Sequence, residues 1–237
     1  MPMEKSKKLH LAIIPDGNRR WAKSKMMMPW KGHEKAVKNF KSILSWCEQN
    51  KKISILTIWC FSTENWKRDK KEKDILFNIL LEYLHEERST FIEKKIRLMH
   101  SGRKDRIPKN LINLIDNISN ETKDNNKFIL HLALDYGGKD EICRAVKKAT
   151  SKVINLEEIQ NIFTKDDCLK PYLDQPSLPD IDLISRTSGE IRTSNFFLWQ
   201  STYAEWIFTE ILFPDFTKVN LKKCIKEYFT RKKRFGS

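Results

Sequence analysis

The sequence lacks paired cysteines and long apolar runs. Its five cysteines are widely scattered and include no CxxC pair, which argues against a zinc site or a disulfide framework and favours reduced cysteines. The longest apolar stretch, Ile53 to Phe61, is about half the length that a membrane-spanning helix needs. No secretory signal is visible, because the residues after Met1 lead straight into a lysine cluster. We therefore expect a cytoplasmic protein without a membrane span.

Acidic residues are also in short supply relative to basic ones. The formal net charge of +14 favours anionic partners, and nucleic acid, an acidic membrane surface and polyphosphorylated small molecules all qualify. Hydrophobic residues make up 40% of the chain, which excludes a disordered protein. The length of 237 residues fits one large domain or two small ones. Charge alone does not choose among the three kinds of partner.

What the chain does have is a regular alternation of strand-like and helix-like segments. Helical spacing of apolar residues at 33–47, 72–95, 111–118 and 142–149 separates short runs that are rich in β-branched and aromatic residues. This order predicts right-handed crossovers and an α/β fold with a mainly parallel sheet. The basic residues 1–8 are expected to form a flexible N-terminus. The predicted strands are Leu9–Ile14, Ile53–Phe61, Ile96–His100, Phe128–Leu134 and Asp182–Ser185.

In a parallel sheet, the ligand crevice lies beyond the carboxyl ends of the strands. The loops after Ile14, Phe61, Leu134 and Ser185 should therefore share one edge of the sheet. Most of these loops are rich in polar groups, so we expect the functional residues to gather there.

The first polar cluster follows Ile14 directly. Gly17 permits close backbone approach, and Arg19 and Arg20 offer forked donors that suit phosphate oxygens. Asp16 is a lone carboxylate beside them, which suits a magnesium ion held by one side chain and by substrate phosphates. A surface turn with two solvated arginines explains the same residues equally well.

A second cluster, Ser62 to Arg68, follows the next predicted strand. Its hydroxyl, amide and guanidinium groups could orient an anionic substrate or accept a proton through a neutral group. In the alternative interpretation, Ser62 or Thr63 caps a helix and Asn65 is incidental.

A third cluster, at 186–195, combines two arginines and several hydroxyls with Gly189, as a diphosphate cradle requires. Glu205 stands in an apolar and aromatic run, where a buried carboxylate must be paired or bound to a metal. Alternatively, Glu205 faces solvent on a helix. A lone histidine such as His33 near a helix start is more often a cap or surface residue than a catalyst.

In this order and spacing, the clusters resemble the cis-prenyltransferase family, whose best known members are the undecaprenyl diphosphate synthases. The resemblance covers nearly the whole chain and implies one catalytic domain at 9–237. It implies a six-stranded, mainly parallel sheet flanked by helices, a hydrophobic product tunnel and a homodimer. The matching stretches are HLAIIPDGNRRWAK (10–23), GHEKAV (32–37), LTIWCFSTENWKR (56–68), LALDYGG (132–138), DLISRTSGEIRTSNFFLWQSTYAEWIFTEILFPDF (182–216) and the R-x-G of 234–236.

The resemblance implies head-to-tail addition of isopentenyl diphosphate to an allylic diphosphate such as farnesyl diphosphate. The product would be a cis-polyprenyl diphosphate of undecaprenyl type. By similarity, Asp16 would hold Mg²⁺ and assist departure of the allylic diphosphate, Asn65 would help to remove a proton, and Glu205 would be a second metal-associated carboxylate. Loss of diphosphate needs magnesium and arginines for the developing negative charge, not a nucleophile. The chain contains no DDxxD motif, the metal signature of trans-prenyltransferases.

The same resemblance assigns the remaining site residues to the two substrates. The residues expected around the allylic diphosphate are Gly17, Asn18, Arg19, Arg20, Trp21 and His33. The second motif adds Ser62, Thr63, Glu64, Trp66 and Arg68. Isopentenyl diphosphate would be bound by Arg186, Arg192, Thr193 and Ser194, while Arg234 and Gly236 would complete the site of the neighbouring subunit. The tunnel could be walled by Phe40, Ile43, Ile75, Ile79, Leu80 and Tyr83, which could equally be ordinary core.

The chain departs from the family pattern at four positions: Pro15 replaces a common methionine, Arg19 a frequent glycine, Pro29 an arginine and Asp135 an asparagine. Lys31 could supply the charge that is missing at Pro29.

Three rival hypotheses remain. A nucleic-acid-binding protein is disfavoured because the lysines are spread through helices and tails. A non-catalytic partner subunit is disfavoured because the aspartate and the arginines of the motifs are present. An enzyme that joins two dimethylallyl units irregularly would keep the same motifs. Peripheral contact with a membrane is compatible with all of these observations.

Overall fold

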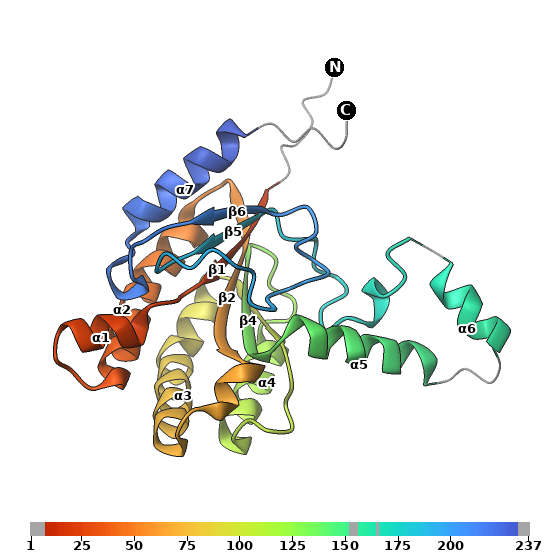
Figure 1. Cartoon of the computed structure of the whole chain (residues 1–237), viewed down its shortest axis with the longest axis horizontal. Coiled ribbons are helices and arrows are strands. Elements are labelled where there is room, and N and C mark those ends of the chain that lie inside the picture. The colour runs from red at the N-terminus through yellow and green to blue at the C-terminus, as the bar shows by residue number, and fades with distance from the viewer. Residues whose placement is uncertain (1–7, 152–155, 165, 232–237) are drawn as a thin grey trace.

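The computed structural model describes residues 8–151, 156–164 and 166–231, which form a twisted sheet with helices on both faces (Figure 1). Its six strands are all parallel, in the order β3-β4-β2-β1-β5-β6. The predicted α/β fold with a mainly parallel sheet is therefore confirmed. The strands are β1 (Leu9–Ile14), β2 (Ile53–Ser62), β3 (Ile96–Ser101), β4 (Phe128–Tyr136), β5 (Leu183–Arg186) and β6 (Glu205–Phe208).

Helices connect the strands, and each helix that the sequence predicted is present. The α-helices of the described chain are α1 (Asn18–Ser24), α2 (Pro29–Gln49), α3 (Lys70–Glu93), α4 (Lys109–Glu121), α5 (Gly138–Thr150), α6 (Leu156–Phe163) and α7 (Lys218–Thr230). Short 3₁₀ helices lie at η1 (Thr63–Lys67), η2 (Lys170–Tyr172) and η3 (Phe213–Asp215). The apolar pattern did not predict α1, α6, α7 or β6, which are short or only partly buried elements.

The two faces of the sheet bury separate apolar layers because side chains alternate along a strand. Leu11 and Ile13 of β1 join the larger core, which includes residues of α2, α3, α4 and α7. Ala12 and Ile14 point to the other face, where they pack in a second core with Phe196. All six residues of β1 are buried, as expected of a central strand.

The strand register brings the polar loops together. Ile14 at the end of β1 lies opposite Arg186 at the end of β5, and Ser62 at the end of β2 lies opposite Tyr136 at the end of β4. The expectation that these loops share one edge of the sheet is therefore confirmed. No helix among the described residues is long and apolar enough to cross a membrane.

The first two helices cross closely at this edge. A Cβ atom at Gly32 of α2 would lie 2.0 Å from the carbonyl oxygen of Asn18, the first residue of α1. Only glycine allows this approach, so Gly32 fixes where α1 and Asn18 lie relative to α2.

We expect Gly32→Ala to lower the free energy of unfolding by about 1–3 kcal/mol, because the added methyl group forces the two helix backbones apart. Urea denaturation measures this change. The exposed Lys35→Ala on the same helix is the control and should stay within about 0.5 kcal/mol of the parent. Equal stability of the Gly32→Ala protein and the control would contradict the close crossing.

Candidate active site

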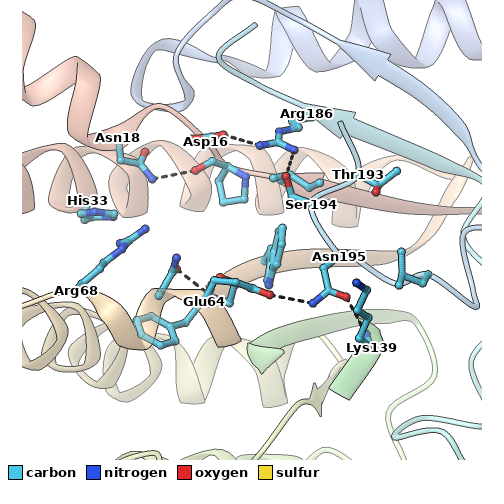
Figure 2. A pocket seen from close by; sticks show the side chains of 18 residues that line it. Asp16, Asn18, His33, Glu64, Arg68, Lys139, Arg186, Thr193, Ser194 and Asn195 are labelled. Atoms are coloured by element: carbon cyan, nitrogen blue, oxygen red, sulfur yellow. Dashed lines mark hydrogen bonds and ion pairs between the residues drawn. The ribbon is translucent and has the colours of Figure 1, made fainter. Parts of the chain in front are cut away.

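A cleft of about 720 Å³ opens at the edge where the polar loops meet (Figure 2). One wall carries Asp16 and Asn18 together with Arg186, and the facing wall carries Glu64 and Arg68. The lining residues are Ile14, Pro15, Asp16, Asn18, His33, Trp59, Cys60, Phe61, Ser62, Glu64, Asn65, Arg68, Lys139, Arg186, Thr193, Ser194, Asn195 and Leu198. The structure thus brings ten of the residues proposed from the sequence into one cavity.

Asp16 is held in place by its backbone and by its carboxylate. The Gly17 N–H donates to Oδ1 at 2.7 Å, and Arg186 Nη2 donates to Oδ2 at 2.9 Å. The Asp16 carbonyl accepts the Thr187 hydroxyl at 2.7 Å and the Phe213 N–H at 3.1 Å. The side chain is one-third exposed (33%), so the fixed carboxylate still reaches the cleft.

Arg186 is the most buried charge in the cleft, with only 4% of its side chain exposed. Its Nη1 donates to the Ser194 hydroxyl at 2.7 Å and to the Arg192 carbonyl at 2.5 Å, while Nη2 reaches Asp16. Its Nε is buried and has no hydrogen-bond partner within the described chain. Because buried donors are almost always paired, this N–H marks a position for an acceptor oxygen of a ligand.

Arg68, which lines the other end of the cleft, shares one buried carboxylate with Arg19, which does not line it. Arg68 Nη1 lies 3.3 Å from Glu72 Oε1, and Arg19 Nε lies 3.7 Å from the same oxygen. The Glu72 side chain is only 9% exposed, so a buried carboxylate holds both guanidinium groups in place. Arg20 does not line the cleft but lies beside Asp16, with its Nη2 3.8 Å from Asp16 Oδ1. It also donates to the Ser188 carbonyl and hydroxyl at 3.0 and 2.6 Å and so ties α1 to the loop after β5.

His33 lies near these arginines as an uncharged ring. Burial, with the positive charges of Arg68 and Arg19, lowers its pKa to about 3. His33 Nε2 and Asn18 Oδ1 both line the cleft, are buried, and have no partner in the part of the chain that the structure describes. These two atoms and the Arg186 Nε are the buried side-chain atoms of the cleft that a ligand could satisfy.

The second motif both caps a helix and lines the cleft. Ser62 is the N-cap of η1 in a capping box with Asn65, whose Oδ1 accepts the Ser62 N–H at 3.2 Å. The helix-cap interpretation therefore holds for Ser62, although Ser62, Glu64 and Asn65 still face the cavity. Thr63 instead packs against Gly137, where an added Cβ would lie 2.5 Å from the Thr63 hydroxyl.

Asn195 and Lys139 also line the cleft. From the sequence, Asn195 was only the last residue of the third cluster, without an assigned role, and Lys139 was not proposed. Asn195 Nδ2 donates to Glu64 at 2.9 Å, and its Oδ1 accepts the Lys139 N–H at 2.8 Å (Figure 2). Asn195 thereby joins the third cluster to η1 and to the start of α5. The signal for Lys139 was its place directly after the Gly137-Gly138 turn that ends a predicted strand.

Several residues proposed from the sequence lie away from the cleft. The Trp21 indole donates to Asp215 at 2.9 Å on the surface, and the exposed Arg192 pairs with Glu190. The Trp66 indole donates to Asp135 at 2.7 Å. Arg234 and Gly236 lie outside the described residues.

Glu205 does not lie with Asp16 in this chain. It is the first residue of β6 and is paired in register with Leu183, the first residue of β5, whereas Asp16 follows the far end of β1. Since the strands are parallel, the two carboxylates belong to opposite ends of the sheet. Glu205 is partly exposed and accepts a hydrogen bond from Arg231 Nη1 at 2.8 Å.

The carboxylates of the cleft suit a magnesium ion that takes most of its ligands from substrate and water. No cluster of three or more His, Cys, Asp or Glu side chains that could hold a metal occurs among the described residues. Magnesium at phosphate-binding sites commonly uses one or two carboxylates with phosphate oxygens and water. Asp16 fits that donor set.

A second, apolar cavity of about 110 Å³ continues from the cleft between α2, α3 and the sheet. Asn18, His33 and Trp59 line both cavities. The tunnel residues suggested from the sequence divide into two groups. Phe40, Ile79, Leu80 and Tyr83 line the cavity, whereas Ile43 and Ile75 do not.

Comparison with known proteins accounts for this arrangement. Residues 14–236 match the model of the family described as "Putative undecaprenyl diphosphate synthase". The chain is 45% identical over 227 residues to an isoprenyl transferase of Helicobacter pylori strain J99, with 96% of both chains covered. The chain belongs to the undecaprenyl diphosphate synthase family of cis-prenyltransferases. The resemblance drawn from the motifs is thus confirmed, and the protein is an isoprenyl transferase.

Other relatives span this family. A tritrans,polycis-undecaprenyl-diphosphate synthase (geranylgeranyl-diphosphate specific) of Pyrococcus horikoshii is 40% identical, with 96% of this chain and 86% of the relative covered. Lavandulyl diphosphate synthase from Lavandula x intermedia, solved in complex with dimethylallyl diphosphate, matches with a TM-score of 0.88 at 35% identity and covers 96% and 98% of the two chains. A probable undecaprenyl diphosphate synthase from Campylobacter jejuni matches with a TM-score of 0.79 at 34% identity, covering 98% and 100%.

In this isoprenyl transferase, a buried ion pair supports the second motif. Asp135 has no exposed side-chain surface and a φ of 51°, and it accepts Arg106 Nε at 2.8 Å and Nη2 at 2.5 Å. The same carboxylate accepts the indole N–H of Trp66, and the Arg106 guanidinium lies 5.3 Å from the Trp66 ring centre. Because Trp66 belongs to η1, this cluster fixes the element that carries Glu64 and Asn65 to the cleft.

We expect Arg106→Met to lower the free energy of unfolding by roughly 2–3 kcal/mol, because it leaves the Asp135 carboxylate buried without its cation. This is less than for a fully buried pair, since the Arg106 side chain is 36% exposed. Chemical denaturation of a double-mutant cycle measures it, and Arg106→Met combined with Asp135→Asn should recover most of the loss. A double variant no more stable than Arg106→Met would contradict the proposed pairing.

Proposed function

We propose that this transferase condenses isopentenyl diphosphate with an allylic diphosphate, with the help of Mg²⁺, to give a cis-polyprenyl diphosphate. The observation that carries the proposal is the Asp16–Arg186 pair in a cationic cleft that continues into an apolar tunnel. Such a site suits a substrate with a charged head and a growing hydrocarbon tail. The family and the isoprenyl transferase activity support the same reaction.

The allylic diphosphate would bind at the end of the cleft that borders the tunnel. Asn18 and His33 line both cavities, so a tail in the tunnel places its diphosphate beside them. Arg19 and Arg68 supply positive charge there, and the Gly17 backbone permits close approach, with a φ of 98°. Neutral His33 can donate or accept a hydrogen bond without adding charge at the tunnel mouth.

Isopentenyl diphosphate would bind at the other end of the cleft. Arg186 offers its unpaired Nε, and the hydroxyls of Thr193 and Ser194 stand on the same loop. The exposed Arg192 can turn from Glu190 towards a bound diphosphate, since its side chain is 60% exposed. Lys139 adds a cation on the facing wall.

Asp16 would hold the magnesium ion through its side-chain carboxylate. Bound there, the ion would neutralise the negative charge that develops as the allylic diphosphate leaves. Asp16 is fixed through Gly17, Thr187 and Phe213, so little reorganisation is needed. An amide is not itself a base, so the diphosphate released in the reaction would accept the proton that leaves the condensing carbon, and Asn65 would orient that transfer by hydrogen bonding.

A homodimer would give Glu205 a role that it cannot have within one chain. Glu205 lies at the opposite end of the sheet from Asp16, so it could join a metal site only on a second copy. Arg234 and Gly236 would act on the neighbouring site in the same way. The enzyme would act in the cytoplasm, with peripheral contact to the membrane that receives its product.

A second candidate reaction joins two dimethylallyl units irregularly. It is supported by the likeness to lavandulyl diphosphate synthase, whose structure holds dimethylallyl diphosphate. Incubation with each primer and identification of the product's carbon skeleton separate the two reactions.

Asp16→Ala should reduce turnover by about 100-fold or more, because the site loses its metal-holding carboxylate. The measurement is incorporation of labelled isopentenyl diphosphate with Mg²⁺ and farnesyl diphosphate, and circular dichroism checks the fold. Asp74→Asn, an exposed carboxylate on α3, is the control and should keep the parent rate. An undiminished rate in Asp16→Ala would refute the role assigned to Asp16.

Leu80→Trp should shorten the product by one or more isoprene units, because the larger side chain fills a tunnel of only about 110 Å³. Chromatography of the dephosphorylated products measures chain length. The control Ile92→Trp lies on the exposed side of the same helix, where 47% of the side chain faces solvent, and should leave the product unchanged. Products of parent length from Leu80→Trp would exclude this cavity as the path of the chain.

A further inference from the structure

Met26, Met27 and Met28 are the only consecutive large apolar side chains that are exposed among the described residues. Met26 is 97% exposed, Met27 50% and Met28 54%. They occupy the loop between α1 and α2, the two helices that follow the carboxyl end of β1 (Figure 1). Single exposed apolar side chains are ordinary, whereas contiguous ones mark an interaction surface. We call residues Met26–Met28 the methionine loop.

The backbone of the methionine loop is fixed. The Met26 N–H donates to the Lys23 carbonyl at 3.0 Å and the Met27 N–H to the Ala22 carbonyl at 2.9 Å, which closes α1 in a Schellman motif. Met26 occupies the left-handed position of that motif, with a φ of 54°. Glycine or asparagine is usual there, because a side chain strains the left-handed conformation. The chain therefore presents a long apolar side chain where the backbone alone favours glycine.

Positive charge surrounds the methionine loop. Residues 19–38 contain seven Lys or Arg side chains and one acidic residue, Glu34, which pairs with Lys31. Lys23 and Lys25 flank the loop, are exposed, and form no ion pair within the described chain. An anionic lipid interface attracts such a surface in two ways. The apolar side chains become buried among the lipids, and the basic side chains are attracted to the negative headgroups.

The position of the loop connects it with the apolar cavity. Helix α2 begins at Pro29, directly after the loop, and lines the tunnel through Ala36, Val37 and Phe40. A lipid surface against the methionine loop would thus lie next to the helix that walls the tunnel. We propose that Met26–Met28 insert into the interface of an anionic membrane while Lys23 and Lys25 contact its headgroups.

Binding of the full-length protein to vesicles tests the proposal without any need for turnover. Sedimentation with vesicles of phosphatidylcholine and phosphatidylserine should carry the protein down, and vesicles of phosphatidylcholine alone should bind it several-fold less. Met26→Ser/Met27→Ser/Met28→Ser should weaken binding to the anionic vesicles about tenfold or more, because the interface loses its apolar burial. Lys23→Gln/Lys25→Gln should instead remove most of the preference for anionic lipid.

Matched variants keep the result interpretable. Val219→Ser/Phe229→Ser removes two comparably exposed apolar side chains from α7 and should bind like the parent. Met26→Gly should raise the melting temperature, by relieving the left-handed strain, and yet weaken vesicle binding. That opposite pair of changes is not expected if Met26 serves only the fold.

Three outcomes would overturn the proposal. The triple methionine variant could bind anionic vesicles as tightly as the parent, or the α7 variant could lose binding to the same extent. Alternatively, the triple variant could change the molecular mass in light scattering, which would make the methionine loop an interface between two copies of the chain. Because the assay contains no diphosphate substrate, failure here is distinct from failure of the proposed condensation.

Discussion

The ion pair between Asp16 and Arg186 joins the ends of the two strands on which the cleft depends. Ile14 of β1 is paired with Arg186 of β5, so a carboxylate two residues beyond one strand meets the last side chain of the other. A guanidinium that is only 4% exposed is costly to bury unless it is paired. The Asp16 carboxylate, the Ser194 hydroxyl and the Arg192 carbonyl accept hydrogen bonds from the two Nη groups of Arg186. The Nε–H of Arg186 remains for a ligand. The same contacts that stabilise the loop thus prepare the site for an anion.

The boundary between cleft and tunnel is set by where charge can be tolerated. Polar groups gather beyond the strand ends, while the space between α2, α3 and the sheet is lined mainly by apolar side chains. His33 stands at this boundary, and its lowered pKa keeps it uncharged where a positive ring would face both arginines and hydrocarbon. Separation of a charged head from an apolar tail is therefore built into the fold.

The sequence predicted the elements that local pattern determines. Long, β-branched runs such as Ile53–Phe61 are unambiguous, whereas β6 has only four residues of mixed exposure and no clear alternation. Asp16, Arg186 and Ser194 could be placed in one site because parallel strands end at one edge. The role of Asn195 could not be predicted, because it depends on which segments its amide joins. A sequence also does not show at which end of the sheet Glu205 lies. The Ser62 cap shows why a motif can be structural and line a cleft at once.

The departures from the family pattern at residues 19 and 29 are related by position. Proline suits the first turn of α2, where its missing N–H costs nothing, but Pro29 cannot supply a cation. The Lys31 ammonium lies 2.8 Å from Glu34 on the surface, and Lys31 is not among the residues that line the cleft. Arg19, the second residue of α1, lies 3.7 Å from the Glu72 carboxylate that also pairs with Arg68, and its charge helps to lower the pKa of His33. We infer that Arg19, which does not itself line the cleft, contributes positive charge near His33, on the side of the cleft where residue 29 carries none.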